Sequence, residues 1–188
     1  MGWLFAFCAC RADEGPVFVP RARIIENKCV LYRPIQRGDF NKLYAIEQSC
    51  FQRPERFSQR YLRQLIKGEQ AATWVAVDEQ NAPVGFALVA WGAAEQGTLA
   101  YIETLEVVAM ARRQGAGAGL LRCCIESARS VQAVVLWLHV AEENEAVRKL
   151  YLAHDFAVQG REKNFYGRGR DGLVLALWLA QQTPVRAE

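Results

Sequence analysis

The sequence predicts a mixed α/β domain with a mostly antiparallel central sheet and helices on both of its faces. Strand-like segments and segments with apolar residues at helical spacing follow one another as strand, two helices, three strands, helix, strand, helix and two strands. The chain has 188 residues, of which 52% are hydrophobic and 23% charged. This size and composition are typical of one globular domain that folds without a metal or disulfide staple.

The first predicted elements are a strand, two helices and a pair of strands. A short strand is expected over residues 30–35. Asp39 and Ser58 are expected to cap the two helices that follow, because their side-chain oxygens can accept hydrogen bonds from the free N–H groups of a first helical turn. Residues 73–77 and 84–91 flank a polar loop, which predicts two antiparallel strands.

The later elements alternate between the strand and helix patterns. They are a strand over residues 99–108, a helix over 115–130, a strand over 134–140, a helix over 144–154, and strands over 156–160 and 173–180. Residues 134–140 are a nearly continuous apolar run, as expected of a strand that is buried on both faces. A basic loop, residues 161–170, joins the last two strands.

The two ends of the chain show no sustained periodicity. Residues 1–28 are predicted to be an N-terminal extension, residues 29–182 the folded domain and residues 183–188 a tail. Residues 3–10 are apolar, but no Lys or Arg precedes them and the stretch is short for a signal peptide. A cytoplasmic location is therefore expected.

The charge balance and hydropathy restrict the partners. Lys and Arg number 23 and Asp and Glu 20, which gives a formal net charge of +3. An excess this small does not predict nucleic-acid binding, which requires a clustered basic face. No run of 18 apolar residues predicts a membrane span. We therefore expect neither a nucleic acid nor a membrane as a partner.

The six cysteines are predicted to be free thiols, because a chain of this length does not need disulfides. They are Cys8, Cys10, Cys29, Cys50, Cys123 and Cys124. The two histidines, His139 and His154, have no CxxC motif to accompany them as zinc ligands. No metal is therefore expected.

A glycine-rich segment follows the strand over residues 99–108 and begins the next helix. Its residues are Arg112, Arg113, Gln114, Gly115, Ala116, Gly117 and Ala118. Two glycines allow a sharp turn whose N–H groups converge on an anion at the positive end of the helix dipole, and the arginines add charge. The segment matches neither GxxxxGK[ST] nor GxGxxG. It predicts a phosphate or pyrophosphate site, with a helix start packed tightly on its sheet as the alternative.

Two blocks of the sequence resemble the GNAT acyltransferase superfamily. Leu105-Glu106-Val107 followed by Arg112-Arg-Gln-Gly-Ala-Gly is similar to the family's coenzyme A signature, R/Q-x-x-G-x-G/A. The run from Leu138 to Asn144 and on to Leu150-Tyr151 is similar to its second conserved block. The similarity covers about residues 30–180, is nearest to the enzymes that acetylate the N-termini of ribosomal and other proteins, and implies the GNAT acyl-CoA N-acyltransferase fold.

The resemblance implies acetyl-CoA as the cofactor and assigns the residues that would bind it. The pantetheine arm would lie along the strand at residues 105–107, and the pyrophosphate on residues 113–118. The implied cofactor-binding residues are Leu105, Glu106, Val107, Arg112, Arg113, Gln114, Gly115, Ala116, Gly117, Ala118, Asn144 and Tyr151. Asp155 departs from the family pattern, since a glycine is usual before Phe156, and Ala109 stands where proline is common.

His139 has two interpretations. Its neighbours Leu138 and Val140 point to the opposite face of the strand, so spacing alone allows a core histidine bonded to a carbonyl. The resemblance implies a catalytic base at His139 and a general acid at Tyr151. A tyrosine, with a pKa near 10, suits the protonation of a thiolate.

Tyr101 and Glu103 are further candidates for the base. Tyr101-Ile-Glu103-Thr-Leu resembles the segment of amino-terminal acetyltransferases that relay protons through a Tyr and His pair. Tyr101 and His139 would lie on neighbouring strands. The main base stays open among Tyr101, Glu103 and His139, and both strand residues are also plausible as simple cross-strand partners.

The acceptor side is predicted from the loop after residue 160. Asn164-Phe165-Tyr166 resembles a loop that clamps the peptide backbone of substrates, and Tyr101 would share this substrate-binding role. The loop has a local charge of +3, from Arg161, Lys163, Arg168 and Arg170 against Glu162. It is either a solvated basic loop or a surface for an acidic peptide or the cofactor phosphates.

The expected function is the transfer of an acetyl group from acetyl-CoA to a primary amine. The resemblance favours the N-terminal α-amine of a protein or peptide as the acceptor. A small-molecule amine or a lysine side chain is the alternative acceptor. A non-catalytic acyl-CoA-binding module is the alternative from a different class.

Overall fold

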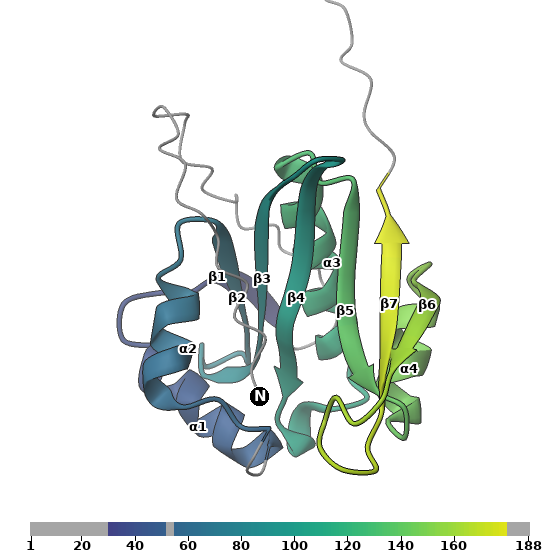
Figure 1. Ribbon diagram of the computed structural model, residues 1–188. Coiled ribbons are helices and arrows are strands. Elements are labelled where there is room, and N and C mark those ends of the chain that lie inside the picture. The colour runs from purple at the N-terminus through teal and green to yellow at the C-terminus, as the bar shows by residue number, and fades with distance from the viewer. Residues whose placement is uncertain (1–29, 52–54, 180–188) are drawn as a thin grey trace, which may run out of the picture.

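The computed structural model describes residues 30–51 and 55–179, and within them the predicted order of elements is confirmed (Figure 1). The elements are β1 (Leu31–Pro34), α1 (Phe40–Cys50), α2 (Gln59–Ile66), β2 (Ala71–Val77), β3 (Pro83–Ala94), β4 (Gly97–Val107), the 3₁₀ helix η1 (Ala109–Ala111), α3 (Ala116–Ser130), β5 (Val135–Ala141), α4 (Glu145–Leu152), β6 (Ala157–Glu162) and β7 (Gly172–Trp178). The predicted N-terminal extension and tail, with Cys8, Cys10 and Cys29, lie outside the described residues.

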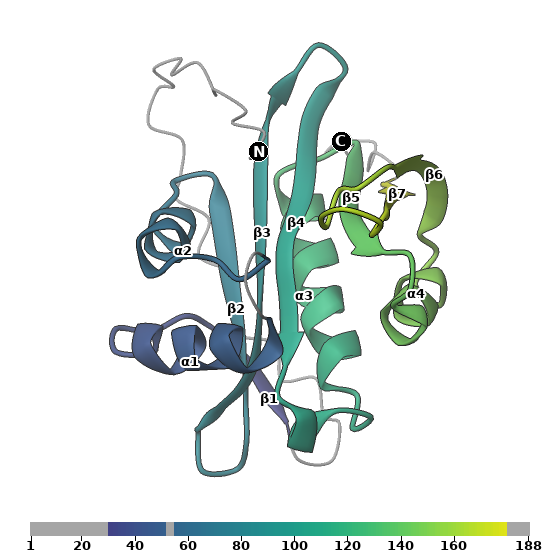
Figure 2. The ribbon, with the colours of Figure 1, turned by 60° about the horizontal axis from the view of Figure 1, so that its bottom comes forward.

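The sheet has the strand order β1-β2-β3-β4-β5-β7-β6, and all neighbours are antiparallel except β4 and β5. Helices α1 and α2 cover one face and helices α3 and α4 the other (Figure 2). This is the mixed, mostly antiparallel sheet with helices on both faces that the sequence predicted. The single parallel pair arises because α3 carries the chain from β4 back across the sheet to β5.

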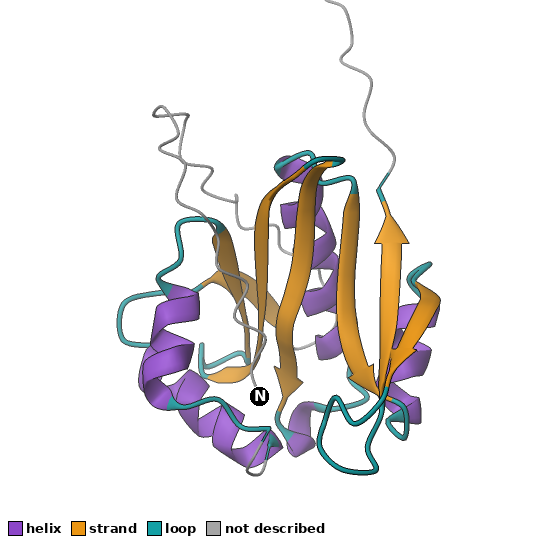
Figure 3. Ribbon diagram, viewed as in Figure 1, coloured by secondary structure: helices purple, strands orange, loops and turns teal. Residues whose placement is uncertain are grey.

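β4 and β5 pair over only three positions and then separate. The paired residues of β4 are Leu99, Ala100 and Tyr101, although β4 continues to Val107 and β5 to Ala141. Figure 3 shows the two strands diverging toward the ends that lead into η1 and α4. Beyond Tyr101 the facing backbone groups of the two strands are thus not used in a shared ladder, and the strands part next to the start of α3.

β4 contains a bulge at Glu103, which has no register partner in β3. Before the bulge, Ala100 and Ile102 belong to the core beneath α3. After it, Leu105 and Val107 pack against that core. One extra residue therefore changes which side chains of the strand face each helical layer.

Two apolar clusters hold the layers together. The larger lies between the sheet, α3 and α4, and it includes Leu120, Leu136 and Leu175, each fully buried or nearly so. The smaller lies beneath α1 and α2, around Leu43 and Phe86. Both helical layers are thus fixed to the sheet on which the site residues lie.

The two predicted helix caps have different outcomes. Ser58 caps α2 as predicted, because its Oγ accepts a hydrogen bond from the Tyr61 N–H at 3.2 Å. Asp39 stands at the N-cap position of α1, but its carboxylate makes no bond to the helix. It pairs with Arg33 of β1 at 2.6 Å and accepts from the Gln36 N–H at 2.7 Å. The predicted capping by Asp39 is wrong because these nearer donors occupy both carboxylate oxygens.

Three further expectations from the sequence concern Asp155, the cysteines and membrane spans. Asp155 adopts a φ of 65°, a left-handed conformation that Asp tolerates better than most residues, in the place where the family pattern has glycine. Cys50, Cys123 and Cys124 are free thiols. No helix in the described part of the chain is long and apolar enough to span a bilayer.

Candidate active site

The predicted phosphate loop forms the start of α3. Gly115 is the N-cap and has a left-handed φ of 84°. Within the described residues, no acceptor bonds the backbone N–H groups of residues 113–118. Arg112 is fixed by a bond of 2.9 Å from its Nε to the Val107 carbonyl, while Arg113 is exposed. Unbonded N–H groups at a helix N-terminus beside two cations fit a phosphate or pyrophosphate group.

The other predicted cofactor residues lie around the same end of the sheet. A Cβ at Gly117 would lie 3.4 Å from Leu150 of α4 and 3.8 Å from Leu105 of β4, so the first turn of α3 packs between these two elements. Asn144 caps α4, because its Oδ1 accepts from the Val147 N–H at 3.3 Å. The carboxyl ends of two parallel strands meet at one edge of a sheet. The strand, loop and helix predicted to hold acetyl-CoA therefore converge where β4 and β5 part.

Tyr101 and His139 meet beside this opening, on the face of the sheet opposite α3. Tyr101 Oη lies 3.1 Å from His139 Nδ1 in hydrogen-bonding geometry. The imidazole stacks on the Phe165 ring, with 3.8 Å between ring centroids and 8° between planes. His139 Nε2 lies 3.3 Å from Glu162 Oε1. His139 is thus not a core histidine bonded to a carbonyl. Its ring contacts the side chains of Tyr101, Glu162 and Phe165 instead.

Burial sets the protonation of these groups. It raises the pKa of Tyr101 far above its usual range and lowers the pKa of His139, although Glu162 partly offsets the latter shift. Near neutral pH, Tyr101 is therefore protonated and donates to Nδ1 of a neutral imidazole, which leaves the Nε2–H on the side of Glu162. Burial also raises the pKa of Glu103 to about 7.

Two more tyrosines belong to the same region. Burial raises the pKa of both Tyr151 and Tyr166, so both hydroxyls stay protonated at neutral pH. Each also raises the pKa of Tyr101, as expected of phenols that face a common space. The Tyr151 side chain is only 5% exposed. Tyr151 thus combines a tightly packed ring with a protonated hydroxyl.

Two of the four basic residues at positions 161–170 form ion pairs within the protein. Arg161 pairs with Glu142 at 2.6 Å and with Asp171 at 3.0 Å. Arg170 pairs with Glu143 at 2.7 Å and also with Glu55 of the segment between α1 and α2. The charges of these two arginines are therefore neutralised by acidic residues, of which Glu55, Glu142 and Glu143 lie outside the basic loop.

The three residues predicted to clamp a peptide have different surroundings. The Asn164 Oδ1 accepts from the Gly169 N–H at 2.6 Å, so this side chain stabilises its own loop. Phe165 covers His139 and remains 39% exposed. Tyr166 packs edge-on against Phe165, with ring centroids 4.9 Å apart. The two aromatic rings, more than Asn164, border the space beside His139.

Two residues at the site were not predicted from the sequence as partners. Glu162 contacts His139 although β7 lies between their strands, and Glu55 joins the segment before α2 to Arg170. Neither pairing has a local signal, because both depend on strand order and loop proximity. The side-chain alternation of β6 was the single hint for Glu162.

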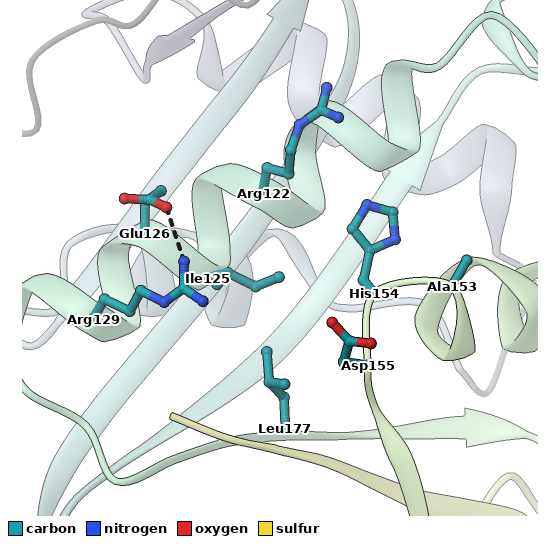
Figure 4. A pocket seen from close by; sticks show the side chains of 8 residues that line it. All are labelled: Arg122, Ile125, Glu126, Arg129, Ala153, His154, Asp155 and Leu177. Carbon is teal, nitrogen blue, oxygen red and sulfur yellow. Dashed lines mark hydrogen bonds and ion pairs between the residues drawn. The ribbon is translucent and has the colours of Figure 1, made fainter. Parts of the chain in front are cut away.

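A hollow between α3 and α4 is separate from this site (Figure 4). It is lined by Arg122, Ile125, Glu126, Arg129, Ala153, His154, Asp155 and Leu177. Arg129 pairs with Glu126 at 3.2 Å, and His154 Nδ1 donates to the Leu150 carbonyl. None of the predicted site residues lines the hollow. In the described residues, no cluster of three or more His, Cys, Asp or Glu side chains could hold a metal ion.

A seven-stranded mixed sheet whose two parallel strands part beside a glycine-rich helix start is the architecture of acyltransferases that use coenzyme A thioesters. The family model described as "Acetyltransferase (GNAT) family" matches residues 40–156, and the chain belongs to this family. The expected family and fold class are thus confirmed, and the expected cosubstrate, acetyl-CoA, agrees with them. Among curated protein sequences, none matches this chain.

Solved structures with the same fold include N-terminal acetyltransferases. NAA60 of Arabidopsis thaliana in complex with a bisubstrate analogue has a TM-score of 0.72 and 23% identity, over 81% of this chain and 99% of that one. Naa50 of the same plant, also with a bisubstrate analogue, has a TM-score of 0.69 and 24% identity, over 80% of this chain and 99% of that one. The ribosomal-protein-S18-alanine N-acetyltransferase of Escherichia coli has a TM-score of 0.69 and 21% identity, over 85% of this chain and 99% of that one. NAA60 has also been solved with acetyl-CoA.

Proposed function

We propose that this acetyltransferase moves the acetyl group of acetyl-CoA to the N-terminal α-amine of a protein or peptide. The observation that carries the proposal is the hydrogen bond between Tyr101 and His139, next to Glu103, at the point where β4 and β5 part. The bisubstrate complexes of NAA60 and Naa50 support the choice of acceptor.

Acetyl-CoA supplies the acetyl group as a thioester, and this chain supplies the groups that would hold it. Residues 113–118 offer backbone N–H groups to its pyrophosphate. Residues 105–107 offer the backbone of β4 beyond its last pairing with β5, and Asn144 offers its side-chain N–H₂ from the start of α4. Each group thus belongs to a rigid element around the same opening.

The acceptor amine must lose two protons, and the site has two groups that can take them. An α-amine has a pKa near 8 and is mostly an ammonium at neutral pH. Glu103, with its pKa raised to about 7 by burial, is suited to take the first proton. The second proton, lost as the amide bond forms, passes through water to Tyr101 as Tyr101 gives its own proton to His139 Nδ1.

Tyr151 completes the transfer as the acid. The thiolate that leaves when the C–S bond breaks needs a proton, and the Tyr151 hydroxyl is protonated on a side chain that is only 5% exposed. Donation from Tyr151 yields the free thiol of coenzyme A and leaves a tyrosinate, which one of the two protons taken from the amine restores to the phenol. The charges then balance, with the ammonium and thioester giving an amide, a thiol and one proton released to solvent.

A peptide panel tests the proposed function. Thiol release is measured with acetyl-CoA and peptides that differ in their first residue, and each peptide is compared with its N-blocked form carrying one lysine. We expect release with free α-amines only, and a strong loss with Tyr151→Phe. Equal release from the N-blocked peptides would assign the activity to lysine side chains instead.

The raised pKa of Glu103 predicts the pH dependence of the reaction. The carboxylate of Glu103 accepts a proton from the ammonium form of the amine, so log kcat/KM should rise with a slope of one up to about pH 7 and then level off. In Glu103→Gln the rise should continue to about pH 8, because only the neutral form of the amine then reacts. A variant profile that still levels off at about pH 7 would exclude Glu103 as the base.

A further inference from the structure

Two buried carboxyl groups outside the reaction scheme face each other between α1 and β4. Glu47 is 1% exposed and Glu106 is 3% exposed. Burial and the neighbouring Glu47 carboxyl both raise the pKa of Glu106. One oxygen of each carboxyl, Oε2, is buried and meets no donor among the described residues.

Among the described residues, no Lys or Arg forms an ion pair with either carboxylate. On α1 the adjacent titratable group is the Cys50 thiol. Arg112 contacts this thiol, with its Nη2 3.9 Å from Cys50 Sγ. From β3 and α2, this core presents Phe86 and Leu62. Two unneutralised carboxylates at one buried site repel strongly, so the pair retains one proton, which also satisfies the facing oxygens.

The other oxygen of each carboxyl is bonded to a different wall of the acceptor site. Glu47 Oε1 accepts from the Phe57 N–H at 2.7 Å, just before the cap of α2. Glu106 Oε1 accepts from Thr104 Oγ1 at 2.7 Å, and Thr104 follows the bulged Glu103 in β4. The carboxyl pair therefore joins the segment before α2 to the part of β4 that carries the candidate base.

We propose that Glu47 and Glu106 share one proton and act as positioning residues, which hold Phe57 and Glu103 at the spacing that the acceptor amine requires. This inference rests on the proposed function for the identity of the acceptor. Neither residue touches the reacting atoms. The pair acts through its bonds to the Phe57 N–H and to Thr104. The shared proton removes the repulsion between the two carboxylates, so that they can connect two buried elements.

Infrared spectroscopy tests the shared proton without any assay. At about pH 8.5 Glu103 is ionised, so a protonated carboxyl band in the wild type would report the pair. We expect this band to vanish in Glu47→Gln and in Glu106→Gln, because an amide then donates in place of the proton, and to persist in the control Glu126→Gln. Absence of the band from the wild type would overturn the shared proton.

Kinetics and hydrogen exchange test the positioning. We expect Glu47→Ala to raise the KM of the peptide about tenfold, with the KM of acetyl-CoA unchanged, and Glu47→Gln to restore it. Amide exchange at residues 57–61 should accelerate in the Ala variant and not in the Gln variant. Unchanged exchange in Glu47→Ala would overturn the positioning role, even if the peptide panel shows that the acceptor is another amine.

Discussion

Replacing Tyr101 by Phe or His139 by Ala is expected to lower kcat by about 10²- to 10⁴-fold, the usual contribution of acid–base catalysis. The hydroxyl and Nδ1 are 3.1 Å apart and belong to one relay, so either loss interrupts it. The double variant should therefore be no slower than the slower single variant. Steady-state kinetics of thiol release with the preferred peptide measures all three.

Matched substitutions separate this effect from a general disturbance. Tyr44→Phe changes a half-buried tyrosine that stacks on Phe40 of the same helix, and His154→Ala changes a histidine bonded to the Leu150 carbonyl. Both should keep kcat within about twofold. Independent, multiplying losses in Tyr101→Phe and His139→Ala would show that the two side chains do not act together.

Substitution of Gly119 by Ala is expected to destabilise the fold by about 1–3 kcal/mol, the usual cost of overpacking. A Cβ at this position of α3 would overlap the ring of Tyr32. Tyr32 cannot easily move, because it is 2% exposed and its Oη donates to the Gly115 carbonyl at 3.3 Å. The midpoint of thermal unfolding should fall by about 3–10 °C.

Gly117→Ala is the control for helix propensity, which favours Ala over Gly by at most about 1 kcal/mol. Its Cβ would have its nearest contact at 3.4 Å, on Leu150 Cδ2, within the ordinary van der Waals range. We expect its midpoint to equal or exceed that of the wild type. If the unfolding midpoint of Gly119→Ala equalled or exceeded that of Gly117→Ala, the close approach of Tyr32 would not limit the size of the side chain at position 119.

The order of elements could be predicted because each element has a local pattern. The apolar run at residues 134–140 and the helical spacing after Gly115 needed no knowledge of their neighbours. The pairing of Tyr101 with His139 was also within reach, since a parallel crossover brings their strands together. What could be predicted was thus the information contained in short stretches of chain and in simple topology.

The features that could not be predicted depend on contacts between distant segments. The charge of Arg170 was visible, but not its partners Glu55 and Glu143. Asp39 had the right position for a cap, yet Arg33 binds its carboxylate. Glu47 lies in a helix pattern like any surface acid until β4 is placed against it. Side-chain electrostatics therefore followed from the tertiary structure and not from composition.

The bulge at Glu103 sets this one residue apart from the alternation of β4. Ile102 and Thr104 pair with the consecutive residues Val89 and Leu88, so their side chains lie on opposite faces, as neighbours in a regular strand would. Deletion of Glu103 would therefore leave a regular ladder with every downstream side chain on its present side. Taking Glu103 into the ladder, in contrast, would turn Leu105 from the α3 core toward α1 and bring the Glu106 carboxyl into the apolar core. The extra residue thus adds a candidate base to the site while the rest of the strand keeps its two faces.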